Sequence, residues 1–160
     1  MRVTKALARH EAAKQTDSKP VAPTPSKKSV LFVCIGNACR SQMAEAFARR
    51  YGSDAAEVSS AGLSPASSIP DLTKAVMLDK NIKLDDQFPK GIEIFPKHQW
   101  DVVVNISGQA LPSLDAQRIL EWRIQDPMGQ RQVVHEKVRD EIENLVMRLI
   151  LELRVASKRP

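Results

Sequence analysis

Cysteine is scarce in this chain, and its scarcity excludes several kinds of protein. Only two of the 160 residues are cysteines, too few for the disulfide framework of a small secreted domain. No apolar run approaches the length needed to span a bilayer, and the first 15 residues lack the apolar segment of a secretory signal. These absences predict a cytoplasmic protein with no membrane partner.

Most of the chain also lacks an excess of charge, although the whole sequence carries a formal net charge of +5. Residues 1–28 contain seven lysines and arginines against two acidic residues, whereas residues 29–160 contain 17 residues of each sign. A nucleic-acid-binding domain would carry its basic excess on the folded part. We therefore expect no nucleic-acid partner, and we predict that residues 1–28 form a disordered, basic, proline-containing tail.

Short apolar runs alternate with amphipathic segments through residues 29–160, which predicts a single α/β domain. Strands are expected at residues 30–33, 58–61, 100–106 and 120–124, and helices at residues 41–51, 70–81, 111–120 and 134–153. This alternation is typical of a four-stranded parallel sheet with helices on both faces. We expect the apolar stripe of the last helix to face the core, with a partner surface as the alternative. In such sheets ligands bind at the carboxyl ends of the strands.

The first loop at such a strand end has the composition of an oxyanion site. The sequence CIGNACRS, residues 34–41, leads from a predicted strand into a predicted helix, whose positive N-terminal end favours an anion. Gly36 and Asn37 tolerate unusual backbone angles, and Arg40 matches two oxygens of a tetrahedral oxyanion. The same field favours the thiolate of Cys34. This pattern predicts a cysteine nucleophile beneath a bound phosphate-like group.

Three other interpretations of this loop are weaker. A nucleotide-binding P-loop would need Gly-Lys-Ser/Thr after the glycine. A zinc site would need more ligands, and His10, His98 and His135 lack ligand spacing, so we expect no metal and no cofactor. An inert buried thiol is the usual interpretation of a single cysteine. Two cysteines that flank Gly-Asn, with Arg and Ser at a helix start, argue against that interpretation.

From residue 30 to about residue 153 the sequence resembles the low-molecular-weight protein tyrosine phosphatase family, which also contains thiol-dependent arsenate reductases. The resemblance rests on four motifs: VCIGNACRSQMAE (33–45), SSAG (59–62), WDVVV (100–104) and EWRIQDPMG (121–129). It implies a phosphatase I-like fold with Cys34 as nucleophile, Arg40 as oxyanion ligand and Asp126 as general acid. The substrate-binding residues that it implies are Ile35, Gly36, Asn37, Ala38, Cys39, Ser41 and Met128, with Ser41 donating a hydrogen bond to the nucleophilic sulfur.

The resemblance leaves the reaction open. The main hypothesis is a cysteine-dependent phosphatase that hydrolyses phosphotyrosine or small aryl phosphates through a phosphocysteine, with a phosphorylated protein or a small oxyanion as partner. The alternative is arsenate reduction through Cys34 and Cys39 with an external thiol, because Gln42 resembles the reductase branch. A non-catalytic oxyanion-binding module is the third hypothesis. Met128 stands where the phosphatases usually carry an aromatic wall of the substrate slot.

Two further residues concern the support of the loop, and one missing cysteine concerns the choice between the reactions. We expect Ser60 to hydrogen-bond Asn37 and so to support the loop. Gln87 stands where many family members have a supporting histidine. Thioredoxin-coupled reductases carry another cysteine after the third strand, whereas this chain reads VVVNISGQALPSL at residues 102–114 and has none.

Overall fold

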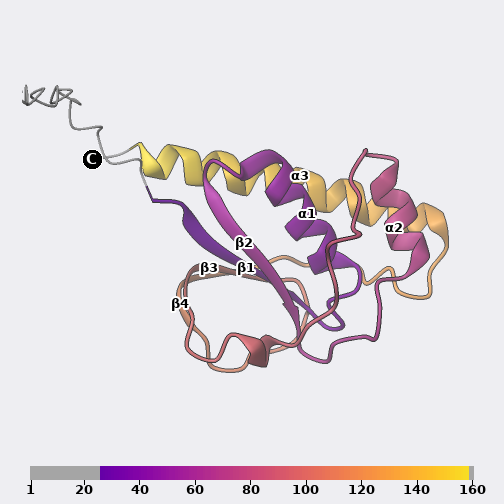
Figure 1. The fold of residues 1–160 in the computed structure, drawn as a ribbon, viewed down its shortest axis with the longest axis horizontal. Helices are drawn as coiled ribbons and strands as arrows, with labels where there is room; N and C mark the ends of the chain where they lie inside the picture. Colours follow the sequence, from indigo (N-terminus) through magenta and orange to yellow (C-terminus); the bar gives the residue numbers. More distant parts are fainter. Residues whose placement is uncertain (1–25, 159–160) are drawn as a thin grey trace, which may run out of the picture.

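The computed structural model describes residues 26–158, which form an α/β domain (Figure 1). Its elements, in chain order, are β1 (Lys28–Cys34), α1 (Arg40–Gly52), β2 (Ala56–Gly62), α2 (Asp71–Leu78), the 3-10 turn η1 (Ile92–Ile94), β3 (Gln99–Asn105), β4 (Asp115–Glu121) and α3 (Gln132–Ser157). All strand pairs are parallel, in the order β2-β1-β3-β4. The predicted fold class is confirmed. The predicted tail lies almost wholly outside the described residues.

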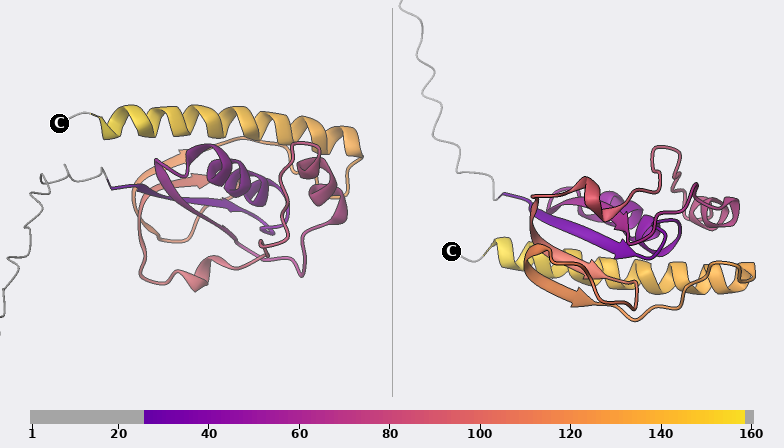
Figure 2. Two further views of the ribbon diagram at one scale, coloured as in Figure 1. Left: turned by 45° about the horizontal axis from the view of Figure 1, so that its top comes forward. Right: turned by 90° about the horizontal axis from the view of Figure 1, so that it is seen from below.

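Side chains of the central strand β1 alternate between two cores. Val30 and Phe32 pack in the larger core, to which α1, α2 and α3 contribute, whereas Leu31 and Val33 pack in a smaller one on the opposite face. Figure 2 shows the three helices together on one side of the sheet. The other face is covered by η1 and by loop side chains around Trp100. Both faces are covered, but the prediction of helices on both faces was wrong: within residues 26–158 all three α-helices pack on one face and no α-helix packs on the other.

The long helix α3 buries the stripe that its sequence spacing predicts. The stripe residues Val138, Ile142, Leu149 and Leu153 are buried, and Leu145 packs against them partly exposed. This arrangement confirms that the stripe faces the core. Within the described part of the chain, no helix is long and apolar enough to cross a membrane.

The prediction for residues 111–124 was wrong in detail. Residues 111–120 form no helix, and the fourth strand covers Asp115–Glu121 rather than residues 120–124. Leu111 and Leu114, which fall within the predicted helix, instead pack as loop residues on the smaller core. The strand itself lies at the sheet edge with mostly exposed side chains, so its backbone pairing with β3 stabilises it and apolar burial gives little signal.

Candidate active site

A small cavity of about 120 Å³ lies where β1 ends and the chain turns into α1. Because a water molecule occupies about 30 Å³ of liquid, the cavity holds a group the size of a tetrahedral oxyanion. The backbone N–H groups in the first turn of α1 lie at the edge of this cavity and have no hydrogen-bond partners within the helix. Eight of the ten predicted site residues line this cavity: Cys34, Ile35, Gly36, Ala38, Cys39, Arg40, Asp126 and Met128.

The other two predicted residues, Asn37 and Ser41, are buried behind the loop instead of lining the cavity. The amide Nδ2 of Asn37 donates to Ser41 Oγ at 2.7 Å and to Ser60 Oγ at 2.9 Å, so the predicted bond to Ser60 is confirmed. Ser41 Oγ lies 2.8 Å from Cys34 Sγ. Since that hydroxyl already accepts a bond from Asn37, its own proton is available to the sulfur, where it stabilises a thiolate.

The loop reaches this shape through one left-handed residue. Asn37 has a φ of 47°, a conformation that asparagine tolerates better than most residues. Gly36, the other residue predicted to need unusual angles, is not in the positive-φ region. The end of β2 then packs directly beneath the loop, because a Cβ atom built on Gly62 would lie 2.8 Å from Asn37 N and 2.8 Å from Ile35 O.

We expect Gly62→Ala to destabilise the protein by about 1–3 kcal/mol and to weaken oxyanion binding. The added methyl group meets the loop backbone, which is held by hydrogen bonds and has no space to retreat without changing the cavity. Thermal unfolding and phosphate titration measure the two effects. Glu57→Ala, an exposed change on the same strand, is the control. If Gly62→Ala matched this control in both measurements, the close packing of strand and loop would be contradicted.

Arg40 is buried and lies between the cavity and two backbone carbonyls. Its Nη1 donates to the carbonyl oxygens of Ile106 at 2.7 Å and Ile124 at 3.1 Å, which follow β3 and β4. Its Nη2 lies 3.5 Å from Asp126 Oδ2. The Asp126 carboxylate is half exposed and accepts a bond from the backbone N–H of Met128 at 3.0 Å. The guanidinium is therefore fixed in orientation beside the cavity that Arg40 lines.

Cys39, the second cysteine of the cavity, is held in the thiol form. Burial is the main cause that raises its pKa to about 11, and the neighbouring Cys34 and Asp126 add to the rise. A hydrogen bond of 3.2 Å from Thr73 Oγ1 to the sulfur, and the charge of Arg40, oppose the rise without cancelling it. Within residues 26–158 no three His, Cys, Asp or Glu side chains gather as metal ligands would.

Sequence reasoning placed Gln87 at a loop-supporting position but missed the rest of the polar network beneath the loop. Gln42 Nε2 donates to both Asn37 O and Asn37 Oδ1 at 2.9 Å, and Gln87 holds Gln42 with a bond of 2.7 Å between their side chains. Glu45, buried in α1, accepts a bond from Ser60, and Lys90 approaches the same serine. One available signal was the single acidic residue within the apolar stretch MAEAFA at residues 43–48.

Comparison with known proteins agrees with this geometry. The family model described as low molecular weight phosphotyrosine protein phosphatase matches residues 29–159. A glutaredoxin arsenate reductase from Synechocystis sp. is 36% identical, over 79% of this chain and 98% of its own length. Arsenate reductase 1 from Bacillus cereus is 37% identical, over 73% of this chain and 90% of its own.

A solved structure described as an arsenate reductase in the phosphate binding state is also similar. It superposes with a TM-score of 0.72 at 32% identity, and the match covers 79% of this chain and 98% of the other. The family match extends over most of the chain, and both relatives share more than a third of their aligned residues with it. The chain therefore belongs to the low molecular weight phosphotyrosine protein phosphatase family.

Proposed function

We propose that the protein is an arsenate reductase that binds arsenate on Cys34 and takes its electrons from an external thiol. One observation carries this proposal: Cys34, Arg40 and Asp126, the three residues that the reaction below uses, line a single oxyanion-sized cavity. Two features support it. Met128 stands at the cavity where a phenyl-binding slot would need an aromatic side chain, and the relatives described above are named arsenate reductases.

In the first step the thiolate of Cys34 attacks arsenic(V) and forms an S–As bond. One As–O bond breaks, and its oxygen leaves as water after taking a proton from the carboxyl group of Asp126, which lines the same cavity. Arg40 and the N-terminus of α1 stabilise the negative charge of the remaining oxygens. Arsenic is still in its +5 state after this step.

In the second step an external thiol attacks the sulfur of Cys34. An S–S bond forms, and the electron pair of the broken S–As bond stays on arsenic, which leaves as arsenite in the +3 state. The two sulfur atoms are oxidised to a mixed disulfide. A second thiol then displaces Cys34 as thiolate and carries the disulfide away, so each arsenite consumes two thiols.

The external thiol makes the first reducing attack because Cys39 is a poor nucleophile in the resting site. With a pKa of about 11, Cys39 is ionised in about one molecule in ten thousand at pH 7. We expect Cys39→Ala to keep the rate of arsenite formation with glutathione within about tenfold of wild type. Steady-state kinetics with saturating thiol measure this rate. A loss as large as that caused by removing Cys34 would assign the reducing attack to Cys39 instead.

The proposal is tested by arsenite release from the full-length protein with glutathione, with glutaredoxin and glutathione, with thioredoxin, and with no reductant. We expect turnover with at least one external thiol and none without it. Release of arsenite in the absence of any reductant, or no release with any of them, would contradict the proposal.

Aryl phosphate hydrolysis is a second candidate, favoured by Asp126, which lines the same cavity as Cys34. The same carboxyl group would protonate a phenoxide leaving group and then activate water against a phosphocysteine. Hydrolysis of para-nitrophenyl phosphate needs no electrons, so one enzyme preparation assayed with and without thiol separates the two reactions. Fast phosphate release together with no arsenite formation would favour this candidate over the reductase.

A further inference from the structure

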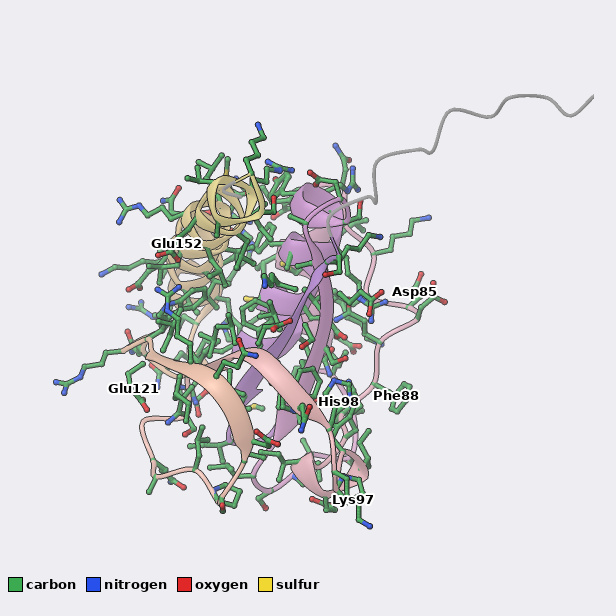
Figure 3. All side chains as sticks on the ribbon, turned by 90° about the vertical axis from the view of Figure 1, so that its left-hand side faces the viewer. Asp85, Phe88, Lys97, His98, Glu121 and Glu152 are labelled. Carbon is green, nitrogen blue, oxygen red and sulfur yellow. The ribbon has the colours of Figure 1, made fainter. Side chains whose placement is uncertain are left out.

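Lys90 lies beneath the oxyanion loop and contacts it through both its backbone and its side chain. Its backbone N–H donates to Asn37 Oδ1 at 3.0 Å, and its carbonyl accepts a bond of 2.8 Å from the N–H of Gly62. Its half-buried ammonium group lies 3.4 Å from Ser60 Oγ. The same ammonium group also lies 5.3 Å from the ring centroid of Phe88, an exposed residue of the same loop (Figure 3), and 3.5 Å from the Phe88 carbonyl oxygen.

The ammonium group of Lys90 faces a negative charge that the oxyanion site has to tolerate. Glu45 is 2% exposed, and its Oε2 accepts the proton of Ser60 at 3.0 Å. Arg49 binds the other carboxylate oxygen at 3.0 Å, but its side chain is 58% exposed, so water weakens that pairing. A continuous series of hydrogen bonds runs from Glu45 through Ser60, Asn37 and Ser41 to the sulfur of Cys34.

We propose that Lys90 is a positioning residue for the oxyanion site: its ammonium charge offsets the buried carboxylate of Glu45 and orients Ser60, which holds Asn37. Without this charge, the buried carboxylate of Glu45 would repel an incoming dianion through a poorly solvated region, where the repulsion is weakly screened. The Ser60 oxygen would also lose one of its two donors and keep only Asn37 Nδ2, while the single proton of its hydroxyl goes to Glu45. The inference rests on the proposed function only in that the cavity binds a tetrahedral oxyanion.

The dependence of oxyanion affinity on pH distinguishes a charge effect of Lys90 from a purely structural role, because only a charge effect follows the pKa of its ammonium group. Burial is the main cause that lowers this pKa below the usual lysine value; the charge of Arg49 adds to the lowering and that of Glu45 opposes it. The charged form supports binding, so oxyanion affinity is present below this pKa and falls as pH rises through it. Glu45 and Arg49 are the charged groups of α1 that face Lys90.

The test uses inorganic phosphate as the probe and isothermal titration calorimetry on the full chain. We expect Lys90→Met and Lys90→Gln to weaken phosphate binding about tenfold at neutral pH, and Lys90→Arg to stay within about threefold of wild type. Lys90→Arg should also shift the alkaline loss of affinity to higher pH, because guanidinium keeps its charge. Lys97→Met, at an exposed lysine, is the matched control and should bind as wild type does.

Glu45→Gln provides an independent check on charge compensation. In that background Lys90→Met should weaken binding by less than it does in wild type. Wild-type affinity in Lys90→Gln, or an equal effect of Lys90→Met with and without Glu45, would overturn the inference. If Lys90→Met lowers the thermal midpoint of unfolding, its weaker binding no longer tests the inference. The test is then the dependence of phosphate affinity on alkaline pH in wild type and in Lys90→Arg, and identical profiles for the two proteins would overturn the inference. A protein that binds phosphate without reducing arsenate would contradict the proposed function and leave this test intact.

Discussion

Replacing Cys34 by serine is expected to lower the rate of arsenite formation by at least about 10³-fold. The sulfur lies 2.8 Å from the Ser41 hydroxyl, and Cys34 lines the cavity in which the proposed reaction takes place. A serine hydroxyl keeps its proton at neutral pH, and an oxygen atom cannot form the disulfide through which the electrons pass. Both chemical steps are therefore lost, whichever thiol is supplied.

Oxyanion binding should survive this change, because Arg40 and the N-terminus of α1 remain in place. We expect Cys34→Ser to bind phosphate within about tenfold of wild type, measured by calorimetry, while arsenite formation is measured with glutathione. Cys39→Ser is the matched control, since it removes the other thiol from the same cavity. Arsenite formation by Cys34→Ser at more than a few per cent of the wild-type rate would exclude Cys34 as the nucleophile.

Arg40→Lys is expected to lower kcat/KM for arsenate by about 10²–10³-fold. One terminal nitrogen of the guanidinium donates to the carbonyls of Ile106 and Ile124, and the other lies near Asp126. The planar group therefore makes its buried hydrogen bonds and faces the cavity residue Asp126 at the same time. A lysine ammonium is a single point that cannot satisfy two carbonyls and clamp two oxyanion oxygens together. Affinity for phosphate should fall as well, since the lost contacts exist before the reaction begins.

The control for Arg40→Lys is Arg50→Lys, an exposed residue of the same helix that donates to the Asn81 carbonyl. This variant should match wild type in kcat/KM and in phosphate affinity. Thermal unfolding separates a local effect from a general loss of folded protein. If Arg40→Lys retained wild-type kcat/KM, the arginine would not contact the reacting oxyanion and its buried bonds would serve the fold alone.

The core of the site was predictable because its residues are neighbours in the sequence. Cys34 to Ser41 follow a buried strand and open a helix, and this local arrangement brings the nucleophile, the arginine and the supporting hydroxyl together. Asp126 is 92 positions after Cys34, and only the family resemblance connected the two. The parallel sheet explains why the two residues line one cavity, since β1 and β4 end at the same edge of the sheet and Asp126 follows β4.

The parts that sequence reasoning missed depend on contacts without a periodic signal. Lys90 lies in a stretch with no helix or strand, so nothing in its spacing shows that it turns beneath the loop, and only the family resemblance pointed to Gln87 in the same stretch. An acidic residue in an amphipathic helix is usually exposed, and only the structure shows that the Glu45 carboxylate accepts a hydrogen bond from Ser60. β4 was misplaced for a related reason: its pairing is made by the backbone, and Ile119 and its neighbours stay exposed.

The measurement that tests the proposed function most directly is mass spectrometry of Cys34 during turnover. The Cys39→Ala protein is mixed with arsenate and glutathione, quenched with acid and digested. We predict a mixed disulfide between glutathione and Cys34 that accumulates only when arsenate is present and that forms together with arsenite. Arsenite that appears while Cys34 stays unmodified in every quenched sample, or the same disulfide formed equally without arsenate, would contradict electron transfer through this residue.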